Sequence, residues 1–386
     1  MKRCAHVAVV GVWLVLMAAA GGAGAQVEPK SDPNDVYWSD QFDGAGMDDA
    51  VFAFAMGGSG NVYAGGVFTT AGGSVPANYI AKWDGAAWSA LGTGMGGGYP
   101  WPLLAALAVD GSGNVYAGGR FTVAGGVAAN CIAKWDGAAW SPLGTGMDDS
   151  VVTLAMDSSG NVYAGGGFTT AGGVTVNHIA KWNGAAWSAL GTGINDWVNA
   201  LAVDGSGNLY AGGGFTTAGG VAANCIAKWD GTAWSVLGTG MNNWVAALAV
   251  DGSGNVYAGG GFTMAGGVAA NRIAKWDGAA WSALGTGMSD HVEDLAVDGS
   301  GNVYAGGNFT TAGGMAANSI AKWDGTAWST LGTGMNNEVM ALAVNRWGNL
   351  YVGGFFTTAG DKVSGYIALW QPFAEEDEPP PGCFGG

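Results

Sequence analysis

The sequence predicts an all-β fold, a seven-bladed β-propeller with four antiparallel strands in each blade. The first observation is a repeat of 47 residues, with one interval of 53, marked by an Asn-Val/Leu-Tyr step. The second is that each copy consists of short apolar runs separated by Gly, Asn and Asp turns, as strands and hairpins do. The third is that the two ends of the chain carry complementary parts of one copy. The step begins at Asn61, Asn114, Asn161, Asn208, Asn255, Asn302 and Asn349.

Within one copy, four strands are expected. The first run is apolar throughout, which is typical of a strand buried on both faces. An Asp-Gly-Ser-Gly turn, an Ala-Gly-Gly turn and an Asp-Gly pair then separate the later runs. In the fifth copy the expected strands cover 245–250, 255–263, 271–276 and 281–284. A unit of this length cannot bury both faces of its sheet alone, so neighbouring copies must pack against one another.

The ends of the chain predict how the ring closes. The seventh copy stops at Gln371-Pro372 without its fourth strand. The missing piece stands near the N-terminus, where Tyr37-Trp38-Ser39 and a following Gly-Ala-Gly-Met mirror the end of the second copy. We therefore expect an N-terminal strand to complete the C-terminal blade, which would leave no open sheet edge. Fourth strands are then expected at Trp38, Trp88, Trp140, Trp187, Trp234, Trp281 and Trp328.

Residues outside the repeats predict secretion. Residues 1–25 have a basic start, an apolar run over 7–20 and small residues ending at Ala25, the pattern of a signal peptide cleaved near Ala25. That run is too short for a membrane span, which needs about 20 residues. We expect a secreted or cell-surface protein, with the periplasm as an alternative, and no membrane insertion. The remaining divisions are a leader over 26–36, the propeller over 37–372 and an acidic Pro/Gly-rich tail over 373–386.

The charge balance argues against two classes of partner. Without the signal peptide the chain has 11 Lys and Arg against 29 Asp and Glu, a net charge of −18. Nucleic acids and anionic lipid surfaces both require a cationic face, so neither is an expected partner. Cys131 and Cys225 occupy the same position two copies apart, too distant for a disulfide. We expect a monomeric propeller without a disulfide framework.

The repeat resembles a known group of families. Asp-Gly-Ser-Gly-Asn-Val-Tyr-Ala-Gly-Gly over 110–119 is similar to the D-x-x-G-N-x-Y-x-x-G core of secreted bacterial β-propeller repeats. The resemblance covers about 37–372 and implies a secreted or cell-surface propeller. The repeat length is also similar to that of tachylectin-type lectin propellers. Trp-Asp pairs such as Trp135-Asp136 occur, but the Gly-His partner of the WD40 signature is absent, so the scaffold roles of WD40 proteins are not implied.

Residues for catalysis are scarce. The mature chain has only His178 and His291, at unrelated repeat positions, and no protease, phosphate-binding or zinc motif follows from the sequence. We expect no catalytic residues, no cofactor and no metal, with an enzyme of unrecognised site as a third hypothesis. The turn from Asp110 to Asn114 places oxygens as a short calcium loop would, yet it lacks a bidentate acid. An Asx-type hairpin turn is the favoured interpretation.

Two side-chain types that recur in the copies have structural interpretations. The paired tryptophans, such as Trp276 and Trp281, are expected to pack against the neighbouring blade. The Lys of Ala-Lys-Trp, such as Lys275, is expected to cover apolar surface with its stem or to pair with an Asp.

Differences between the copies point to a candidate binding surface. Variation concentrates after the Gly-Thr-Gly-Met turn and just after the Asn of the third strand, and these loops should emerge on one face. Asn, Asp and exposed Trp are residues that hydrogen-bond to and stack on sugars or hold a peptide. An insertion over 96–102 falls in the same class of loop. The candidate ligand-binding residues are Trp101, Asn195, Trp197, Asn242, Asn243, Trp244, His291 and Glu338.

Two functional hypotheses follow. In the first, the protein is a secreted, non-catalytic and multivalent binding module whose repeated weak sites for a glycan or a surface protein add through avidity. In the second, it is a structural surface scaffold or spacer that holds no small-molecule ligand. Variation among copies could also reflect unselected drift in surface loops.

Overall fold

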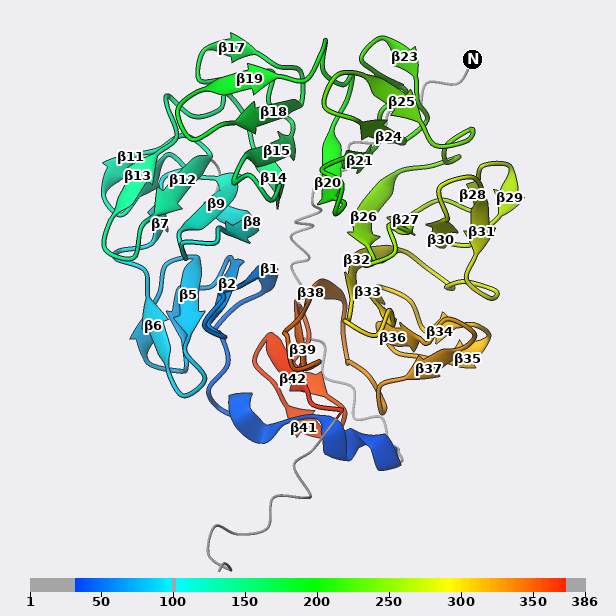
Figure 1. Ribbon diagram of the computed structural model, residues 1–386. Helices are drawn as coiled ribbons and strands as arrows, with labels where there is room; N and C mark the ends of the chain where they lie inside the picture. The colour runs from blue at the N-terminus through cyan, green and yellow to red at the C-terminus, as the bar shows by residue number, and fades with distance from the viewer. Residues whose placement is uncertain (1–31, 99–101, 373–386) are drawn as a thin grey trace, which may run out of the picture.

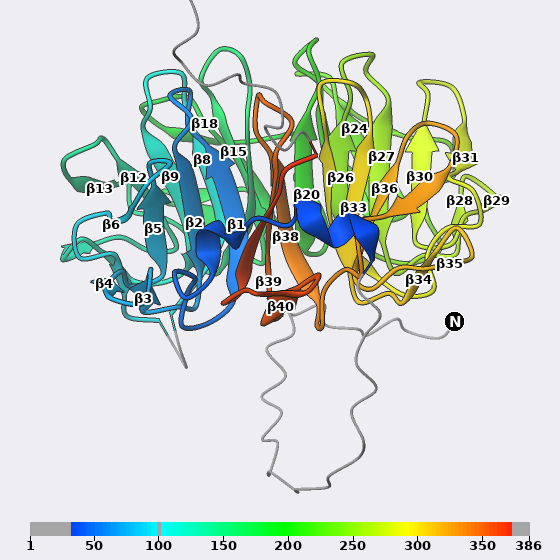
Figure 2. The same cartoon turned by 90° about the horizontal axis from the view of Figure 1, so that it is seen from below.

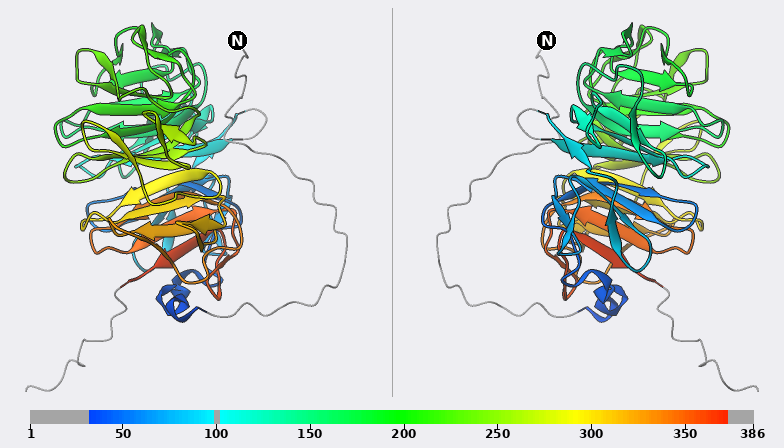
Figure 3. Two further views of the ribbon diagram at one scale, coloured as in Figure 1. Left: turned by 90° about the vertical axis from the view of Figure 1, so that its right-hand side faces the viewer. Right: turned by 90° about the vertical axis from the view of Figure 1, so that its left-hand side faces the viewer.

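The protein is a ring of seven antiparallel sheets around a central axis (Figure 1). The computed structural model describes residues 32–98 and 102–372, so the signal peptide, most of the leader and the tail lie outside the described residues. Six of the described sheets have four strands and the seventh has three. We number the blades 1 to 7 in chain order. Figure 3 shows the blades edge-on, with the blue N-terminal 3-10 helices beside the red last strand.

The main strands repeat in the same order from the centre of the ring outward. The inner strands are β1 (Val51–Met56), β8 (Leu103–Val109), β14 (Val151–Met156), β20 (Val198–Val203), β26 (Val245–Val250), β32 (Val292–Val297) and β38 (Val339–Val344). The second strands are β2 (Val62–Gly66), β9 (Val115–Arg120), β15 (Val162–Gly166), β21 (Leu209–Gly213), β27 (Val256–Gly260), β33 (Val303–Gly307) and β39 (Leu350–Gly354). The third strands are β5 (Ile80–Trp83), β12 (Ile132–Trp135), β18 (Ile179–Trp182), β24 (Ile226–Trp229), β30 (Ile273–Trp276), β36 (Ile320–Trp323) and β42 (Ile367–Trp370). The outer strands are β6 (Trp88–Ala90), β13 (Trp140–Pro142), β19 (Trp187–Ala189), β25 (Trp234–Val236), β31 (Trp281–Ala283) and β37 (Trp328–Thr330).

Each blade also carries a small ribbon that the sequence did not predict. In blade 5 the second strand was expected to reach Thr263, but it ends at Gly260, and the chain then forms a two-stranded hairpin. Gly266 and Gly267 have φ of 58° and 86°, which a tight turn requires and glycine adopts without strain. The ribbon pairs are β3 (Thr70–Ala71) with β4 (Val75–Pro76), β10 (Val123–Ala124) with β11 (Val127–Ala128), β16 (Thr170–Ala171) with β17 (Val174–Thr175), β22 (Thr217–Ala218) with β23 (Val221–Ala222), β28 (Met264–Ala265) with β29 (Val268–Ala269), β34 (Thr311–Ala312) with β35 (Met315–Ala316), and β40 (Thr358–Ala359) with β41 (Lys362–Val363).

The ribbons hold the connections between blades in place. The residue that ends each connecting turn, a Met or Ile194, pairs with the ribbon of the next blade, as Met241 does with Ala265. In blade 2 this contact is larger, because β7 (Met95–Gly96) adds a third strand to the ribbon. Each connection is therefore fixed at the end of the sheet where the ribbons lie.

The interfaces between blades contain the core. Aromatic and branched side chains such as Phe309, Ile273 and Val292 are fully buried between blades 5 and 6. The paired tryptophans lie here, as expected, with the rings of Trp276 and Trp281 5.5 Å apart. The indole Nε1 of Trp281 also donates to the Leu237 carbonyl of the preceding blade, at 2.9 Å. This hydrogen bond joins neighbouring blades and recurs around the ring.

The N-terminal segment closes the ring, as the sequence predicted. Trp38 forms an antiparallel bridge with Trp370 of blade 7. Ser39 N donates to the Leu369 carbonyl and Gln371 N donates to the Tyr37 carbonyl, both at 2.9 Å. The Trp38 indole donates to the Leu331 carbonyl of blade 6 at 3.2 Å, the same bond that the other outer tryptophans make.

The closing segment is shorter than the full strand that was expected. It is a single bridge between two 3-10 helices, η1 (Pro33–Tyr37) and η2 (Asp40–Phe42). The capping side chains of Asp32 and Ser39 fold the chain into these turns on either side of Trp38. Buried Asp35 accepts a 2.7 Å hydrogen bond from Thr333 N, which fixes the segment against blade 6.

Candidate functional site

The connections between blades and the ribbons emerge on one face of the ring, which we call the loop face. Figure 2 shows the labelled ribbon strands β3, β4, β34, β35 and β40 along its lower edge, below the sheets. Register explains this grouping, because the start of each inner strand pairs with the end of the second strand, which pairs with the start of the third. The turns between inner and second strands lie on the opposite face, the hairpin face.

Four positions that differ between otherwise similar copies meet on the loop face. The entry position precedes the inner strand and is Ala50, Leu103, Ser150, Trp197, Trp244, His291 or Glu338. The bulge position is Phe52, Ala105, Val152, Asn199, Ala246, Glu293 or Met340. The exit position follows the second strand and is Val67, Arg120, Gly167, Gly214, Gly261, Asn308 or Phe355. The left-handed position precedes the third strand and is Tyr79, Cys131, His178, Cys225, Arg272, Ser319 or Tyr366.

Backbone geometry at these positions is the same in every blade. The bulge residue is the extra residue of a β-bulge, as register shifts in all seven inner strands show. The left-handed residue is never glycine, although its φ lies between 61° and 70° in all seven copies. In blade 5 the Arg272 N–H donates to the Phe262 carbonyl and its carbonyl accepts from Gly260 N. Hydrogen bonds between backbone groups fix the conformation at these positions. The side chains there can therefore differ between blades without changing the fold.

Two tryptophans at the entry position are half-buried and lie differently. Trp197 of blade 4 leans against blade 3, where a Cβ on Gly167 would lie 2.5 Å from its ring. Trp244 of blade 5 covers Gly261 of its own blade and contacts the His291 ring edge-on, with centroids 5.0 Å apart. The glycines at these exit positions leave room for the indoles. The two tryptophans therefore occupy related but different sites.

The predicted asparagines divide into two groups. Asn195 and Asn242 cap the ribbons: their Oδ1 atoms accept two backbone N–H groups each and their Nδ2 atoms donate to a threonine hydroxyl. Their amides are thus already bonded within the blade. Asn243 is exposed, with Oδ1 accepting from Trp244 N and Nδ2 donating to the Gly261 carbonyl at 3.3 Å. It lies beside Trp244. Trp101 falls outside the described residues.

Acidic side chains gather on the loop face of blades 6 and 7. Glu293 has a pKa raised to about 7, first by burial and then by the nearby carboxylates of Glu338, Asp294 and Asp290. Burial also raises the pKa of Asp294 to about 7, although it accepts from Leu342 N and Leu295 N. The pKa of Glu338 is raised by burial and then by Asp290. The predicted residues His291 and Glu338 thus border an acidic sector.

This sector predicts a dependence of stability on pH. The folded-state pKa of Glu293 lies above its ordinary value of 4.5, so the fold favours the protonated side chain. Its stabilising contribution to the free energy of unfolding is therefore complete below pH 4.5 and is lost as the pH rises to about 7. Glu293→Gln stays neutral and should recover on the order of 2 kcal/mol of unfolding free energy at pH 8 but little at pH 4. Denaturant unfolding at both pH values measures this. Asp43→Asn, which removes an exposed carboxylate, is the control; equal effects of both variants would contradict the prediction.

Blades 7, 1 and 2 carry an apolar sector on the same face. The rings of Phe52 and Phe355 meet edge-on with centroids 5.5 Å apart. Leu103, Met340 and Tyr366 belong to the same cluster. The face is therefore chemically asymmetric, apolar on one side and polar with tryptophans on the other.

The hairpin face has the geometry of structural turns. In blade 5 the Asp251 carboxylate accepts hydrogen bonds from Ser253 N, Asn255 N, Asn255 Nδ2 and the Tyr257 hydroxyl. This is the Asx-type turn that the sequence favoured over a calcium loop. The ammonium of Lys275 lies 5.7 Å from the centre of the Tyr257 ring. The same Lys–Tyr contact occurs in blades 2 to 6, a cation–π interaction that the sequence analysis did not predict.

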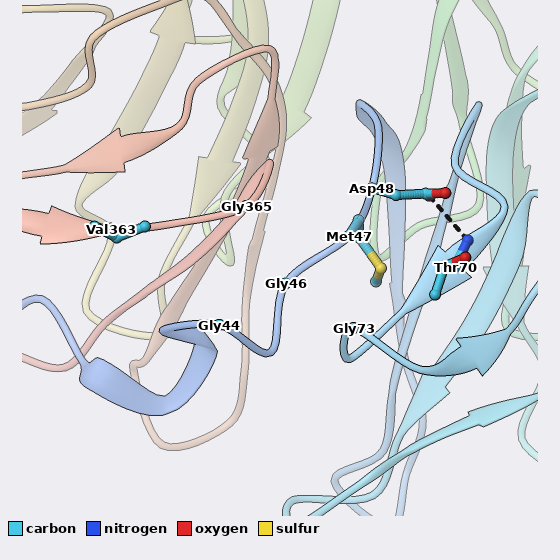
Figure 4. Close-up of a pocket in the computed structure, with 8 residues that line it drawn as sticks. All are labelled: Gly44, Gly46, Met47, Asp48, Thr70, Gly73, Val363 and Gly365. Atoms are coloured by element: carbon cyan, nitrogen blue, oxygen red, sulfur yellow. Dashed lines mark hydrogen bonds between the residues drawn. The ribbon is translucent and has the colours of Figure 1, made fainter.

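A pocket of about 340 Å³ opens at the seam between blade 7, the N-terminal segment and blade 1 (Figure 4). Gly365 stands there where six blades have an asparagine that donates to the connecting loop. Its lining is mostly glycine backbone with Met47 and Val363, and the Asp48 carboxylate is already bonded to Thr69 and Thr70. The pocket therefore offers no free charged group.

Neither a metal cluster nor a membrane-spanning helix occurs in the part of the chain that the structure describes. Within 32–98 and 102–372 no three His, Cys, Asp or Glu side chains are grouped as metal ligands would be. No helix there is long and apolar enough to cross a bilayer. The buried thiol of Cys131 has a pKa raised to about 11 by burial, which disfavours the reactive thiolate.

Sequence reasoning identified the entry and left-handed positions but missed the other two. The bulge position lies inside an apolar strand, where periodicity gives no sign of an extra residue. The exit position falls in a run expected to be strand, yet the same comparison of copies could have found it: Gly, Val, Arg, Asn and Phe alternate there before an invariant Phe-Thr.

Comparisons with known proteins identify the fold alone. No family model and no curated protein matches the chain, so the resemblance to secreted bacterial repeats rests on the residues quoted above. Among solved structures, an extracellular domain from B. thetaiotaomicron aligns with a TM-score of 0.54 at 12% identity, over 83% of this chain and 38% of that one. The WD40 β-propeller domain of Doa1 aligns with a TM-score of 0.53 at 14% identity, over 84% and 93% of the two chains. The chain is a multi-bladed β-propeller.

Proposed function

We propose that this protein is a secreted, non-catalytic binding module whose loop face recognises carbohydrate. The observation that carries the proposal is the placement of variation. Copies that agree at most of their core positions differ at four positions that the fold brings together on one face. The entry position carries six different residues among the seven copies, whereas the Asp-Gly-Ser-Gly turn of the hairpin face is unchanged in four copies and altered in three.

Carbohydrate is the favoured ligand class because of the side chains at these positions. Trp197 and Trp244 are half-buried aromatic rings beside exposed polar groups, the combination that stacks on a sugar ring and bonds to its hydroxyls. Because the variable residues differ from blade to blade, we propose one composite surface around blades 4 to 6 in place of seven equal sites.

A glycan screen with the secreted chain tests this proposal. We expect binding to at least one glycan class, quenching or shift of tryptophan fluorescence on binding, and loss of most affinity in the Trp197→Ala plus Trp244→Ala double variant. The matched control is Trp347→Ala, which removes an exposed tryptophan from the hairpin face. A screen without a ligand, or binding that the double variant retains, would count against carbohydrate recognition on this face.

A platform for protein partners is the second candidate. Met340, Phe355 and Tyr366 are only partly buried at the edge of the apolar sector, and they favour it, since accessible apolar surface often marks a protein contact. Under this alternative, Phe355→Ser should abolish partner binding while the tryptophan double variant leaves it unchanged.

A further inference from the structure

Arg272 is the only Lys or Arg among the seven left-handed positions, where blade 3 has His178. Its Nη1 donates to the Gly261 and Phe262 carbonyls at 3.1 and 3.4 Å. Its Nε is buried without a hydrogen-bond partner, and no carboxylate of the described residues forms an ion pair with it. A buried, unpaired guanidinium N–H costs free energy and is rare in proteins. The chain has many more carboxylates than cations, yet none of the described carboxylates pairs with the Arg272 guanidinium.

Other polar and aromatic groups gather around the same glycine. The Gly261 carbonyl that accepts from Arg272 also accepts from Asn243 Nδ2. A Cβ on Gly261 would lie 2.6 Å from Trp244 Nε1, so the indole and the guanidinium flank one residue. The His291 ring contacts the same indole edge-on. We call Asn243, Trp244, Arg272 and His291 the blade 5 subsite.

We propose that the blade 5 subsite binds an acidic sugar, with Arg272 holding the carboxylate of a uronic acid residue and Trp244 stacking on its ring. This inference rests on the proposed carbohydrate function and names its ligand class. The Nε–H and Nη2–H groups lie along one edge of the planar guanidinium, the fork that matches a carboxylate. Nη1 is anchored to the backbone and Nε has no partner but is buried, so a carboxylate reaches this edge only when the side chains around it shift.

The charges around the subsite are mixed. The Asp290 carboxylate lies 3.4 Å from His291 Nε2, whereas no carboxylate of the described residues forms an ion pair with Arg272. The acidic sector of Glu293 and Glu338 belongs to blades 6 and 7, one and two blades further on. A neutral sugar would leave the fork of Arg272 without an acceptor, whereas a carboxylate supplies one.

Blade 4 provides an internal control. It has a tryptophan at the same entry position, Trp197, but Cys225 stands in place of the arginine. A glycine occupies its exit position too, and a Cβ on Gly214 would meet nothing within 4 Å. Trp197 lies against Gly167 of blade 3, whose left-handed residue is His178, so this tryptophan presents an aromatic ring without a guanidinium.

Calorimetry on the secreted chain with three probes of equal length tests the inference: oligogalacturonate, the neutral galactose oligomer and a sulfated galactose oligomer. We expect the oligogalacturonate to bind at least tenfold more tightly than the neutral oligomer. Arg272→Gln should remove that preference, Arg272→Lys should restore part of it through charge without the fork, and Trp244→Ala should weaken both oligomers. Trp197→Ala should leave the preference intact. Thermal melting of each variant verifies folding.

The outcomes separate this inference from the proposed function. Equal binding of acidic and neutral oligomers, or a preference that Arg272→Gln retains, overturns the acidic-sugar subsite while carbohydrate binding stands. Equal binding of sulfated and carboxylated oligomers overturns the assignment to a carboxylate. An absence of binding to all three oligomers, together with a negative glycan screen, overturns both.

Discussion

Replacing Trp38 with alanine is expected to destabilise the ring by about 3 to 5 kcal/mol, as truncation of a buried tryptophan does. The side chain is 2% exposed, it packs edge-on against Trp370 at 4.9 Å, and its indole bonds to the Leu331 carbonyl. Among the described residues, Trp38 also forms the only β-bridge between the N-terminal segment and β42. Chemical denaturation of the wild type and the variant measures the loss.

Trp281→Ala is the matched control for this change. Trp281 is 5% exposed and donates to the Leu237 carbonyl at 2.9 Å, and its strand β31 is joined to β30 by a covalent hairpin far from the N-terminal segment. We therefore expect both variants to lose core packing, and only Trp38→Ala to make the N-terminal segment sensitive to protease under native conditions. Deleting residues 36–49 should expose the edge of β42 and cause aggregation. An unchanged melting curve after the deletion would contradict closure by this segment.

Gly260→Ala is the second substitution with a large expected effect, a loss of about 3 kcal/mol or more. A Cβ at this position would collide with the Trp244 carbonyl oxygen and lie 3.0 Å from Ala246 N. These atoms are backbone, so no side-chain rotation relieves the contact. The equivalent glycine of every other blade meets the carbonyl of its entry residue in the same way. Displacement of this carbonyl should also move Trp244 and weaken ligand binding.

Gly252→Ala provides the comparison within the same blade. A Cβ at Gly252 meets nothing within 4 Å, and its φ lies outside the region that disfavours alanine. We expect this variant to change the unfolding free energy by less than about 0.5 kcal/mol. Thermal and denaturant unfolding of both variants tests why position 260 requires glycine. The explanation tested is the close approach of the Trp244 carbonyl to residue 260, as opposed to the conformational flexibility of glycine. Equal stability of the two variants would refute that explanation.

Local signals were sufficient for much of the fold. The Asp-Gly-Ser-Gly turns, the apolar inner runs and the Trp-x-x-x-x-Trp spacing are decided by contacts between near neighbours, and β26 matches the expected strand at both ends. The closing role of Trp38 was also readable, because the chain ends carry complementary parts of one repeat. The ribbons were missed because the two-residue strands β28 and β29 are too short to show periodicity.

The candidate site depended far more on tertiary structure. Comparison of copies singled out Trp197 and Trp244 but not Arg272, and it could not show that the amides of Asn195 and Asn242 are already bonded to the ribbons that they cap. Nor could it show that the two tryptophans lean in different directions, because the exit glycines that receive them are distant in sequence: Gly167 precedes Trp197 by 30 residues and Gly261 follows Trp244 by 17.

The sequence by itself determined the number of blades, the order of their strands and the closure of the ring, because a repeated pattern of short-range turns and apolar runs encodes them. Only the tertiary structure decided which variable residues meet, that a bulge places a further side chain among them, and that Arg272 keeps an unpaired edge beside Trp244. The physical reason is that those relations depend on the packing of one blade against the next and on backbone groups that compete for the same side chains.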